Sequence, residues 1–276
     1  MKLGITNTAY NASYENPEGY LKMREHGYEC ADFQGLADKN SEYYRDSDLL
    51  RREREAADDA GISFSQLHGI WPAYETSIEG LREKRDHLIW AIKHAHLLRC
   101  KRIVYHPDMP LGFDTDGEEI YKSNLETVKL LLPFAEEAGV TLCIENMPFV
   151  AAQFSRVHKM AELVEEVDHP LFKMCLDTGH AAVFGDDCGD AVRRIGKNLS
   201  ALHVHDNDGT ADQHLMPYRG VINWENFLST LGEVGFDGVF SFEASPKKTL
   251  PPEELEKARI ELARLGKKMI SDAENG

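Results

Sequence analysis

The chain has 276 residues, of which 47 are acidic and 31 are basic, so its formal net charge is −16. Such a charge repels nucleic-acid backbones and anionic membranes, so we expect neither as a partner. No apolar run reaches the roughly 20 residues of a membrane span, and residues 1–10 lack the features of an export signal. The five cysteines form no Cys-x-x-Cys pair. A reduced, cytoplasmic protein is therefore expected.

Short apolar runs alternate with amphipathic stretches along the whole chain. The apolar runs predict strands at Leu3–Thr6, Tyr28–Phe33, Ile62–Leu67, Arg102–Tyr105, Val140–Ile144, Phe172–Leu176, Ala201–Val204 and Val239–Phe242. The clearest amphipathic stretches predict helices at Ser41–Ala60, Ser77–Leu98, Gly117–Ala138, Ser155–Val167, Trp224–Val234 and Pro252–Ser271. Glycines such as Gly61 and Gly139 separate a helix from the strand that follows it, as a left-handed helix cap does.

This alternation predicts an α/β protein with a single (β/α)8 TIM barrel over residues 1–276. The repeating unit averages about 35 residues, close to the ~30 residues of one strand–helix unit, and the length is typical of such barrels. An open, doubly wound sheet is the alternative. Such a sheet usually begins with a glycine-rich turn after its first strand, and residues 6–14 contain no glycine. The barrel is therefore preferred.

Acidic and imidazole side chains stand at the carboxyl ends of six successive predicted strands. In chain order they are His68, His106, Glu145, Asp177, His203 and Glu243. In a barrel these ends meet at one mouth, where active sites lie. Polar residues often end strands for structural reasons alone. However, three carboxylates collected in one mouth would repel one another, and a divalent cation removes that conflict. The pattern predicts a metal site at the carboxyl ends of the strands.

Three further groups of the metal-binding type follow these strand ends. His180 lies three residues after Asp177, and Asp212 and His214 lie in the loop after the seventh predicted strand. This loop is rich in Asp, Asn and Gly, so a solvated turn is the alternative interpretation. Cys143 and Cys175 lie inside predicted strands, where we expect them to be small core residues.

Three motifs resemble those of the xylose-isomerase-like barrel superfamily. They read Glu145-Asn146-x-Pro148, Leu176-Asp177-Thr178-Gly179-His180 and His203-x-His205-Asp206-Asn207, and they are followed by Trp224 and Glu243. The superfamily includes sugar isomerases and epimerases, inosose dehydratases and endonuclease IV. The resemblance spans nearly the whole chain, and it is specific for the superfamily but not for one reaction.

The resemblance to the epimerase branch implies one Mn²⁺, Mg²⁺ or Co²⁺ ion. Its ligands would be Glu145, Asp177, His203 and Glu243. The resemblance to endonuclease IV implies a three-zinc cluster that also uses five more residues, namely His68, His106, His180, Asp212 and His214. Zn²⁺ is therefore expected if the additional histidines are ligands.

The loops around the mouth favour a small sugar or polyol over DNA. Residues 69–77, 181–190 and 206–214 contain neither Lys nor Arg, whereas phosphate contacts dominate the affinity of DNA-binding proteins. Apolar walls for a small substrate are expected from Ile70, Trp71, Pro72, Tyr74, Phe113, Met147 and Phe149. Arg219 is the one cation expected near the mouth, where it would bind a substrate oxygen or phosphate.

We expect a metal-dependent proton transfer next to a sugar carbonyl, through an enediolate. Glu145 and Glu243 are the expected acid–base pair, because they come from well-separated strands. Epimerisation, aldose–ketose isomerisation and, in an inosose-dehydratase-like lyase, loss of a β-hydroxyl all remain open. The other classes considered are an endonuclease IV-like phosphodiesterase and a non-catalytic sugar-binding barrel. A homo-oligomer is compatible with the sequence, although no segment marks an interface.

Overall fold

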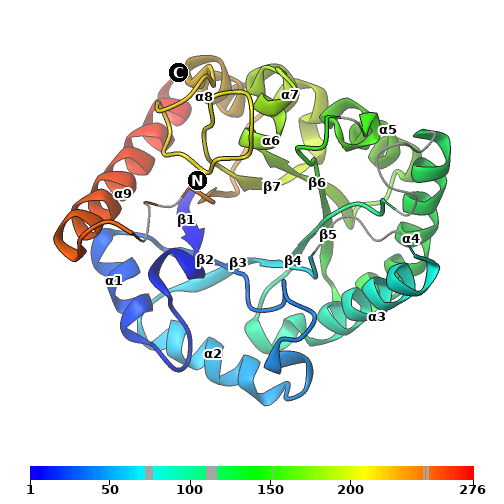
Figure 1. Cartoon of the computed structure of the whole chain (residues 1–276), viewed down its shortest axis with the longest axis horizontal. Helices are drawn as coiled ribbons and strands as arrows, with labels where there is room; N and C mark the ends of the chain where they lie inside the picture. The colour runs from blue at the N-terminus through cyan, green and yellow to red at the C-terminus, as the bar shows by residue number, and fades with distance from the viewer. Residues whose placement is uncertain (72–76, 110–116, 151, 245, 247–248) are drawn as a thin grey trace.

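Eight parallel strands form a closed barrel at the centre of the molecule (Figure 1). A computed structural model describes residues 1–71, 77–109, 117–150, 152–244, 246 and 249–276. The strands are β1 Lys2–Thr6, β2 Cys30–Phe33, β3 Ser63–His68, β4 Arg102–Tyr105, β5 Thr141–Glu145, β6 Phe172–Asp177, β7 Leu199–His203 and β8 Val239–Phe242. Strand β1 pairs with both β2 and β8, and a parallel bridge between Val204 and Phe242 closes the barrel. The predicted barrel is confirmed.

Helices surround the barrel, as expected from the connections between parallel strands (Figure 1). They are α1 Glu18–His26, α2 Asp48–Asp59, α3 Ile78–His94, α4 Gly117–Ala138, α5 Val157–Val167, α6 Thr178–Val183, α7 Cys188–Ile195, α8 Trp224–Glu233 and α9 Pro252–Asn275. Ser77 caps α3 by accepting a hydrogen bond from the amide of Gly80. Within the described ranges, none of these helices is long and apolar enough to cross a bilayer.

The helices of the structure differ from the predicted ranges in two ways. The single helix expected at Ser41–Ala60 is broken into a 3-10 turn at Glu42–Tyr44 and helix α2. The break falls at Asp46, whose carboxylate accepts the amide hydrogen of Asp48 and favours a turn over a continuous helix. The set of clearest helices also omitted α1, α6 and α7, which are short.

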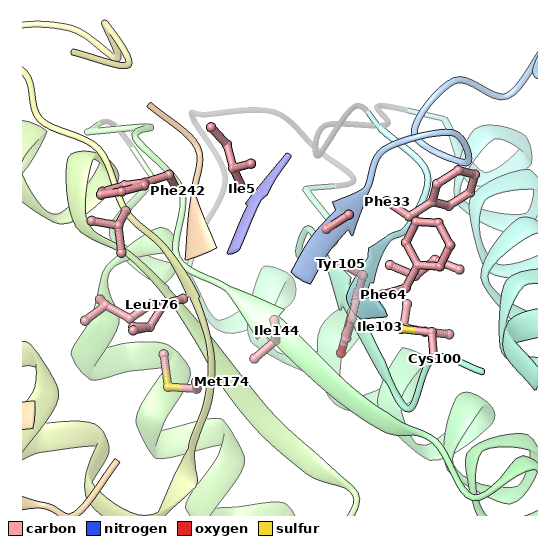
Figure 2. Close-up of a cluster of buried hydrophobic side chains, with 14 of the residues drawn as sticks. Ile5, Phe33, Phe64, Cys100, Ile103, Tyr105, Ile144, Met174, Leu176 and Phe242 are labelled. Atoms are coloured by element: carbon pink, nitrogen blue, oxygen red, sulfur yellow. The ribbon is translucent and has the colours of Figure 1, made fainter. Parts of the chain in front are cut away.

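The strands present two different surfaces, one to the helices and one to the barrel axis. Large apolar side chains face the helices, and Figure 2 shows part of this layer, in which Phe33 and Phe64 lie side by side with ring centroids 5.4 Å apart. The surface facing the axis has a separate cluster of small buried side chains, made of Val104, Cys143, Cys175 and Ala201.

This inner cluster supports the candidate site directly. Its four members lie two residues before His106, Glu145, Asp177 and His203. Because side chains on a strand repeat every two residues, the polar set lies one layer above the small apolar set. Cys143 and Cys175 are therefore small core residues, as expected. Burial raises the pKa of the Cys143 thiol to about 11, which keeps it neutral.

Candidate metal centre

Four side chains from neighbouring strands converge at the carboxyl end of the barrel. Glu145, Asp177 and His203 are the last residues of β5, β6 and β7, and Glu243 directly follows β8. Each offers a ligand atom, and these four atoms all lie within 4.8 Å of one another. Metal–oxygen and metal–nitrogen bonds of about 2.1 Å place opposite ligands roughly 4.2 Å apart. The arrangement, called below the four-ligand cluster, fits a divalent cation.

Asn146 fixes two of these ligands relative to each other. Its side-chain oxygen accepts the amide hydrogen of Asp177 at 2.9 Å, and its side-chain nitrogen donates to the Asp177 carbonyl at 2.9 Å. This pair of bonds extends the β5–β6 pairing one residue beyond the strands. The Glu145-Asn146 motif therefore sets the separation of the Glu145 and Asp177 carboxylates.

The imidazole of His203 is held by Asp32, a buried residue of β2 that was not predicted as a site residue. Its Nε2 atom lies 2.8 Å from Asp32 Oδ2, while its Nδ1 atom faces Glu145 Oε1 at 2.6 Å and Glu243 Oε2 at 3.5 Å. A carboxylate only accepts hydrogen bonds, so Nε2 carries a proton and Nδ1 is the atom that would bind a cation. Gln66 also donates to Asp32, at 3.1 Å. Asp32 is fully buried. Its signal in the sequence was an acidic residue inside the apolar run Tyr28–Phe33.

Replacing Asp32 by Asn should lower the affinity for Mn²⁺ or Zn²⁺ about 10- to 100-fold, because partners of metal-bound histidines have effects of that size. An amide can present its NH2 group to His203, which favours the wrong tautomer. A competition titration against a chromophoric chelator measures the change. Asp59→Asn, on the exposed face of α2, is the matched control. Unchanged affinity in Asp32→Asn would show that Asp32 does not orient His203.

Two histidines lie against the other oxygen of Glu145. The Nε2 atoms of His68 and His106 lie 3.6 and 3.3 Å from Glu145 Oε2. His68 donates from Nδ1 to the Gly69 carbonyl at 2.8 Å, which leaves Nε2 free to act as a ligand. Glu145 Oε2 is buried and has no hydrogen-bond partner among the described residues. An unsatisfied buried carboxylate oxygen beside two imidazole nitrogens is the second feature that fits a cation.

A buried lysine binds the backbone of residues 106 and 107 and the side chain of Asp108. Lys84, from α3, donates to the carbonyls of His106 and Pro107 at 2.8 and 2.9 Å and to Asp108 at 3.0 Å. Burial opposes ionisation of Asp108, but Lys84 and Arg85 hold the pKa of its carboxyl below the usual value. This ion-pair network holds residues 106–108 against α3 and so fixes the backbone that carries His106.

The third group consists of His180, Asp212 and His214. The Nε2 atoms of His180 and His214 both lie 3.2 Å from Asp212 Oδ2. The other ring nitrogen of each histidine faces a backbone carbonyl, that of Asn146 at 2.7 Å and that of Glu243 at 3.3 Å. The structure therefore brings together the residues predicted as metal ligands. The second ring nitrogens of His68, His180, His203 and His214 face acceptors, as in metal-bound histidines, whereas Nδ1 of His106 has no partner among the described residues.

The loop that carries Asp212 is ordered around the carboxylate of Asp206. This side chain accepts the amide hydrogens of Asn207 and Gly220, both at 2.9 Å, and the indole hydrogen of Trp224 at 3.1 Å. Asp206 and Asn207 are buried, whereas Asp208 and residues 210–213 are exposed, so the loop is a solvated turn attached to a buried base. Trp224 takes part through its indole nitrogen and does not face the candidate ligands.

The carboxylates raise the proton affinity of the histidines when no cation is bound. Burial opposes charging of His180 and His214, but the carboxylates around them raise the pKa values to about 10 and about 9. Burial would raise the pKa of Glu145, whereas the adjacent histidines hold it well below its usual value. Burial lowers the pKa of His106 to about 4. His180 and His214 therefore hold protons beside the carboxylates, and a bound cation would displace those protons.

Metal affinity should therefore rise with pH up to about 9. His180 and His214 must each lose a proton before they bind a cation, and their pKa values of about 10 and about 9 keep those protons bound up to this pH. Affinity should increase about tenfold per pH unit for each proton displaced. Calorimetry in buffers of different ionisation enthalpy counts the protons released. A pH-independent affinity with no proton release would contradict imidazole ligation.

Most of the candidate ligands line a cavity of about 410 Å³ at the barrel mouth, while Asp177 and His203 lie behind its lining. Its apolar wall includes Trp71, Met147 and Phe149, as expected. Gln34 and Ala37, from the loop after β2, also line it and were not anticipated. Ile70 is buried, and three further residues expected in the wall lie outside the described residues, namely Pro72, Tyr74 and Phe113.

Arg219 is not among the residues that line the cavity. Its guanidinium is exposed and lies 3.7 Å from Glu261 of α9. The structure therefore separates Arg219 from the other candidate site residues.

Sequence comparison connects the chain with a known family and with several characterised sugar enzymes. The family described as xylose isomerase-like TIM barrel matches residues 21–265. The chain is 28% identical over 262 residues to the uncharacterised protein MJ1311 of Methanocaldococcus jannaschii, covering 88% of this chain and 83% of that one. It is 24% identical over 254 residues to an inosose isomerase of Bacillus velezensis, covering 86% of each. A D-psicose 3-epimerase of Ruminiclostridium cellulolyticum is 29% identical over 52% of this chain and 47% of its own length.

Solved structures share the architecture at lower identity. A D-psicose 3-epimerase from Clostridium cellulolyticum H10, solved with D-tagatose, superposes with a TM-score of 0.80 at 17% identity, over 98% of this chain and 99% of that one. The IOLI protein, solved with a zinc atom, superposes with a TM-score of 0.74 at 21% identity, over 99% and 98%. With the family match over most of its length, this chain belongs to the xylose isomerase-like TIM barrel family.

Proposed function

We propose that this protein is a metal-dependent sugar isomerase or epimerase that moves a proton next to a carbonyl group. The observation that carries the proposal is the convergence of Glu145, Asp177, His203 and Glu243 within 4.8 Å of one another, at one wall of a cavity of sugar size. The related inosose isomerase and the D-psicose 3-epimerase support the substrate class.

The four residues of the cluster have two roles, namely cation binding and proton transfer. Asp177 and His203 would hold a divalent cation, with Glu145 and Glu243 completing its ligand set. When bound, the cation supplies Lewis-acid stabilisation of negative charge on a substrate oxygen. Glu145 and Glu243 both face the cavity, so one carboxylate takes the proton from the carbon beside the carbonyl. The other returns a proton to the resulting enediolate.

The apolar wall of the cavity orients the substrate and excludes water. Trp71 and Phe149 offer aromatic faces to the apolar side of a sugar ring or chain. Return of the proton to the opposite face gives epimerisation, return to the neighbouring carbon gives isomerisation, and loss of a β-hydroxyl gives dehydration. A screen of ketoses, aldoses and keto-inositols with Mn²⁺, Mg²⁺, Co²⁺ or Zn²⁺ in D2O tests the proposal. Product formation with deuterium on carbon is expected, and the absence of both with every metal would contradict it.

A three-zinc phosphodiesterase similar to endonuclease IV is the second candidate. The observation in its favour is that ligand atoms gather in three further groups beside the four-ligand cluster. These groups are His68–Glu145–His203, Asp177–His180–His205 and His205–Asp212–His214, so more than one cation has ligands available. The net charge of −16 opposes it, because nucleic acid would be repelled. Zinc content near three per chain together with salt-dependent binding of abasic DNA would favour this candidate over the first.

A further inference from the structure

We propose that His205 is a positioning residue that connects the four-ligand cluster to the loop carrying Asp212 and His214. This inference rests on the proposed metal centre but not on the sugar chemistry assigned to it. It predicts that a cation bound at the four-ligand cluster also stabilises the loop of residues 206–214. Neither the expected ligand set nor the acid–base pair includes this histidine.

His205 is fully buried between two carboxylates from different segments. It lies two residues after His203, and its Nε2 atom is 3.0 Å from Asp177 Oδ2 and 3.6 Å from Asp212 Oδ1. A carboxylate only accepts hydrogen bonds, so a hydrogen on Nε2 is donated to Asp177 Oδ2. The ring serves to hold Asp177.

Asp177 is then fixed at both of its oxygens. Oδ1 accepts the amide hydrogen of His180 at 2.6 Å, and Oδ2 accepts from His205. A carboxylate held at both oxygens keeps its remaining lone pairs pointed in one direction. Loss of the His205 contact would free Asp177 Oδ2 to rotate away from the cluster.

The other side of the His205 ring contacts the loop. The imidazole rings of His205 and His214 are stacked, with centroids 4.3 Å apart and an angle of 17° between their planes. His214 in turn contacts Asp212 through Nε2. One ring therefore touches a ligand of the four-ligand cluster on one side and the loop on the other.

The space for this ring depends on the glycine of the Asp177-Thr178-Gly179-His180 motif. A Cβ atom added to Gly179 would lie 1.9 Å from Cε1 and 2.3 Å from Nδ1 of His205. Asn207 also donates to the Gly179 carbonyl at 2.7 Å, which holds the backbone of Gly179 in place. Glycine is required at this position because the imidazole lies directly against the backbone.

The first test measures Mn²⁺ affinity and loop protection together. His205→Ala should bind Mn²⁺ about 10- to 100-fold more weakly than the unchanged protein. In the unchanged protein, Mn²⁺ should slow hydrogen exchange of residues 206–214, and in His205→Ala that protection should disappear even at saturating Mn²⁺. His205→Gln retains a donor for Asp177 and should recover part of the affinity. His96→Ala, on the protein surface, is the matched control.

A second test uses Gly179 and remains informative if His205→Ala folds poorly. Gly179→Ala alone should lower both the melting temperature and the Mn²⁺ affinity, because its methyl group displaces the ring. In the His205→Ala background the same substitution should have little further effect on either measurement. Equal effects of Gly179→Ala with and without the His205 ring would overturn the inference.

The outcomes also separate this inference from the proposed metal centre. If the unchanged protein binds neither Mn²⁺ nor Zn²⁺, the metal centre is wrong and the inference is overturned with it. If the unchanged protein binds Mn²⁺ and His205→Ala binds it equally well with the same loop protection, only the inference is overturned.

Discussion

Replacing Glu145 by Gln should reduce turnover of the substrate about 1,000-fold or more. The amide keeps the size of the carboxylate but cannot accept the proton from carbon, and acid–base residues commonly contribute 10²- to 10⁴-fold to the rate. Because Glu145 is also a candidate metal ligand, the metal content of the variant must be measured beside its activity. The assay follows deuterium incorporation at the carbon next to the carbonyl by NMR.

Glu243→Gln provides the comparison at the other carboxylate of the proposed acid–base pair. If Glu243 only returns the proton, this variant should still exchange the substrate proton with solvent while forming much less product. If the two carboxylates reverse roles, the phenotypes of the two variants exchange. Glu225→Gln, on the exposed start of α8, is the control and should retain full activity. Normal turnover by metal-loaded Glu145→Gln would remove Glu145 from the mechanism.

The sequence was sufficient for the barrel and for the side chains at the strand ends because both depend on local patterns. A strand buried on both faces is recognisable in the sequence as a short apolar run. A polar residue that ends such a run, such as Glu145 or Asp177, is recognisable in the same way. The parallel arrangement then brings these ends together without further information. The convergence of β4 to β8 on one cavity follows from that rule.

Contacts between distant segments could not be predicted in the same way. Asp32 contacts His203 across 171 positions of the chain, and Lys84 of α3 donates to the carbonyl of His106. An acidic residue inside an apolar run marks Asp32 but does not identify its partner, and Lys84 has no distinctive neighbourhood in the sequence. Their roles appear only when the strand register and the helix packing are known. The same applies to His205, whose motif was recognised although its contact with Asp177 was not.

Arg219 was expected near the barrel mouth, but its side chain points elsewhere. Its place in a loop after β7 suggested the barrel mouth, but loop direction depends on the internal bonds of the loop. Asp206 accepts the amide hydrogen of Gly220 at 2.9 Å, and Arg219 projects towards Glu261 of α9. A sequence pattern predicts where a loop begins. The directions of its side chains depend on buried hydrogen bonds within the loop, such as those that Asp206 accepts.

A bound divalent cation should stabilise the folded protein strongly, because the ligand carboxylates otherwise repel one another in a buried place. At a free Mn²⁺ concentration 1,000 times the dissociation constant, linkage gives about 4 kcal/mol of added free energy of unfolding. For a domain of this size, 1 kcal/mol shifts the melting temperature by about 2–4 °C, so a rise on the order of 10 °C is expected. Calorimetric scans with Mn²⁺ and with a chelator measure it.

Ligand variants assign this stabilisation to particular residues. Asp177→Asn should lose most of the Mn²⁺-induced rise, while Asp59→Asn should keep it. His106→Gln lies outside the four-ligand cluster, so it should leave the effect of a first cation intact and remove only the increment from further Zn²⁺ ions. A rise that survives Asp177→Asn unchanged would place the cation elsewhere. Loss of the whole effect in His106→Gln would instead mean that the tightest cation lies between His68, His106 and Glu145, because the first ion bound determines most of the stabilisation at low metal concentration.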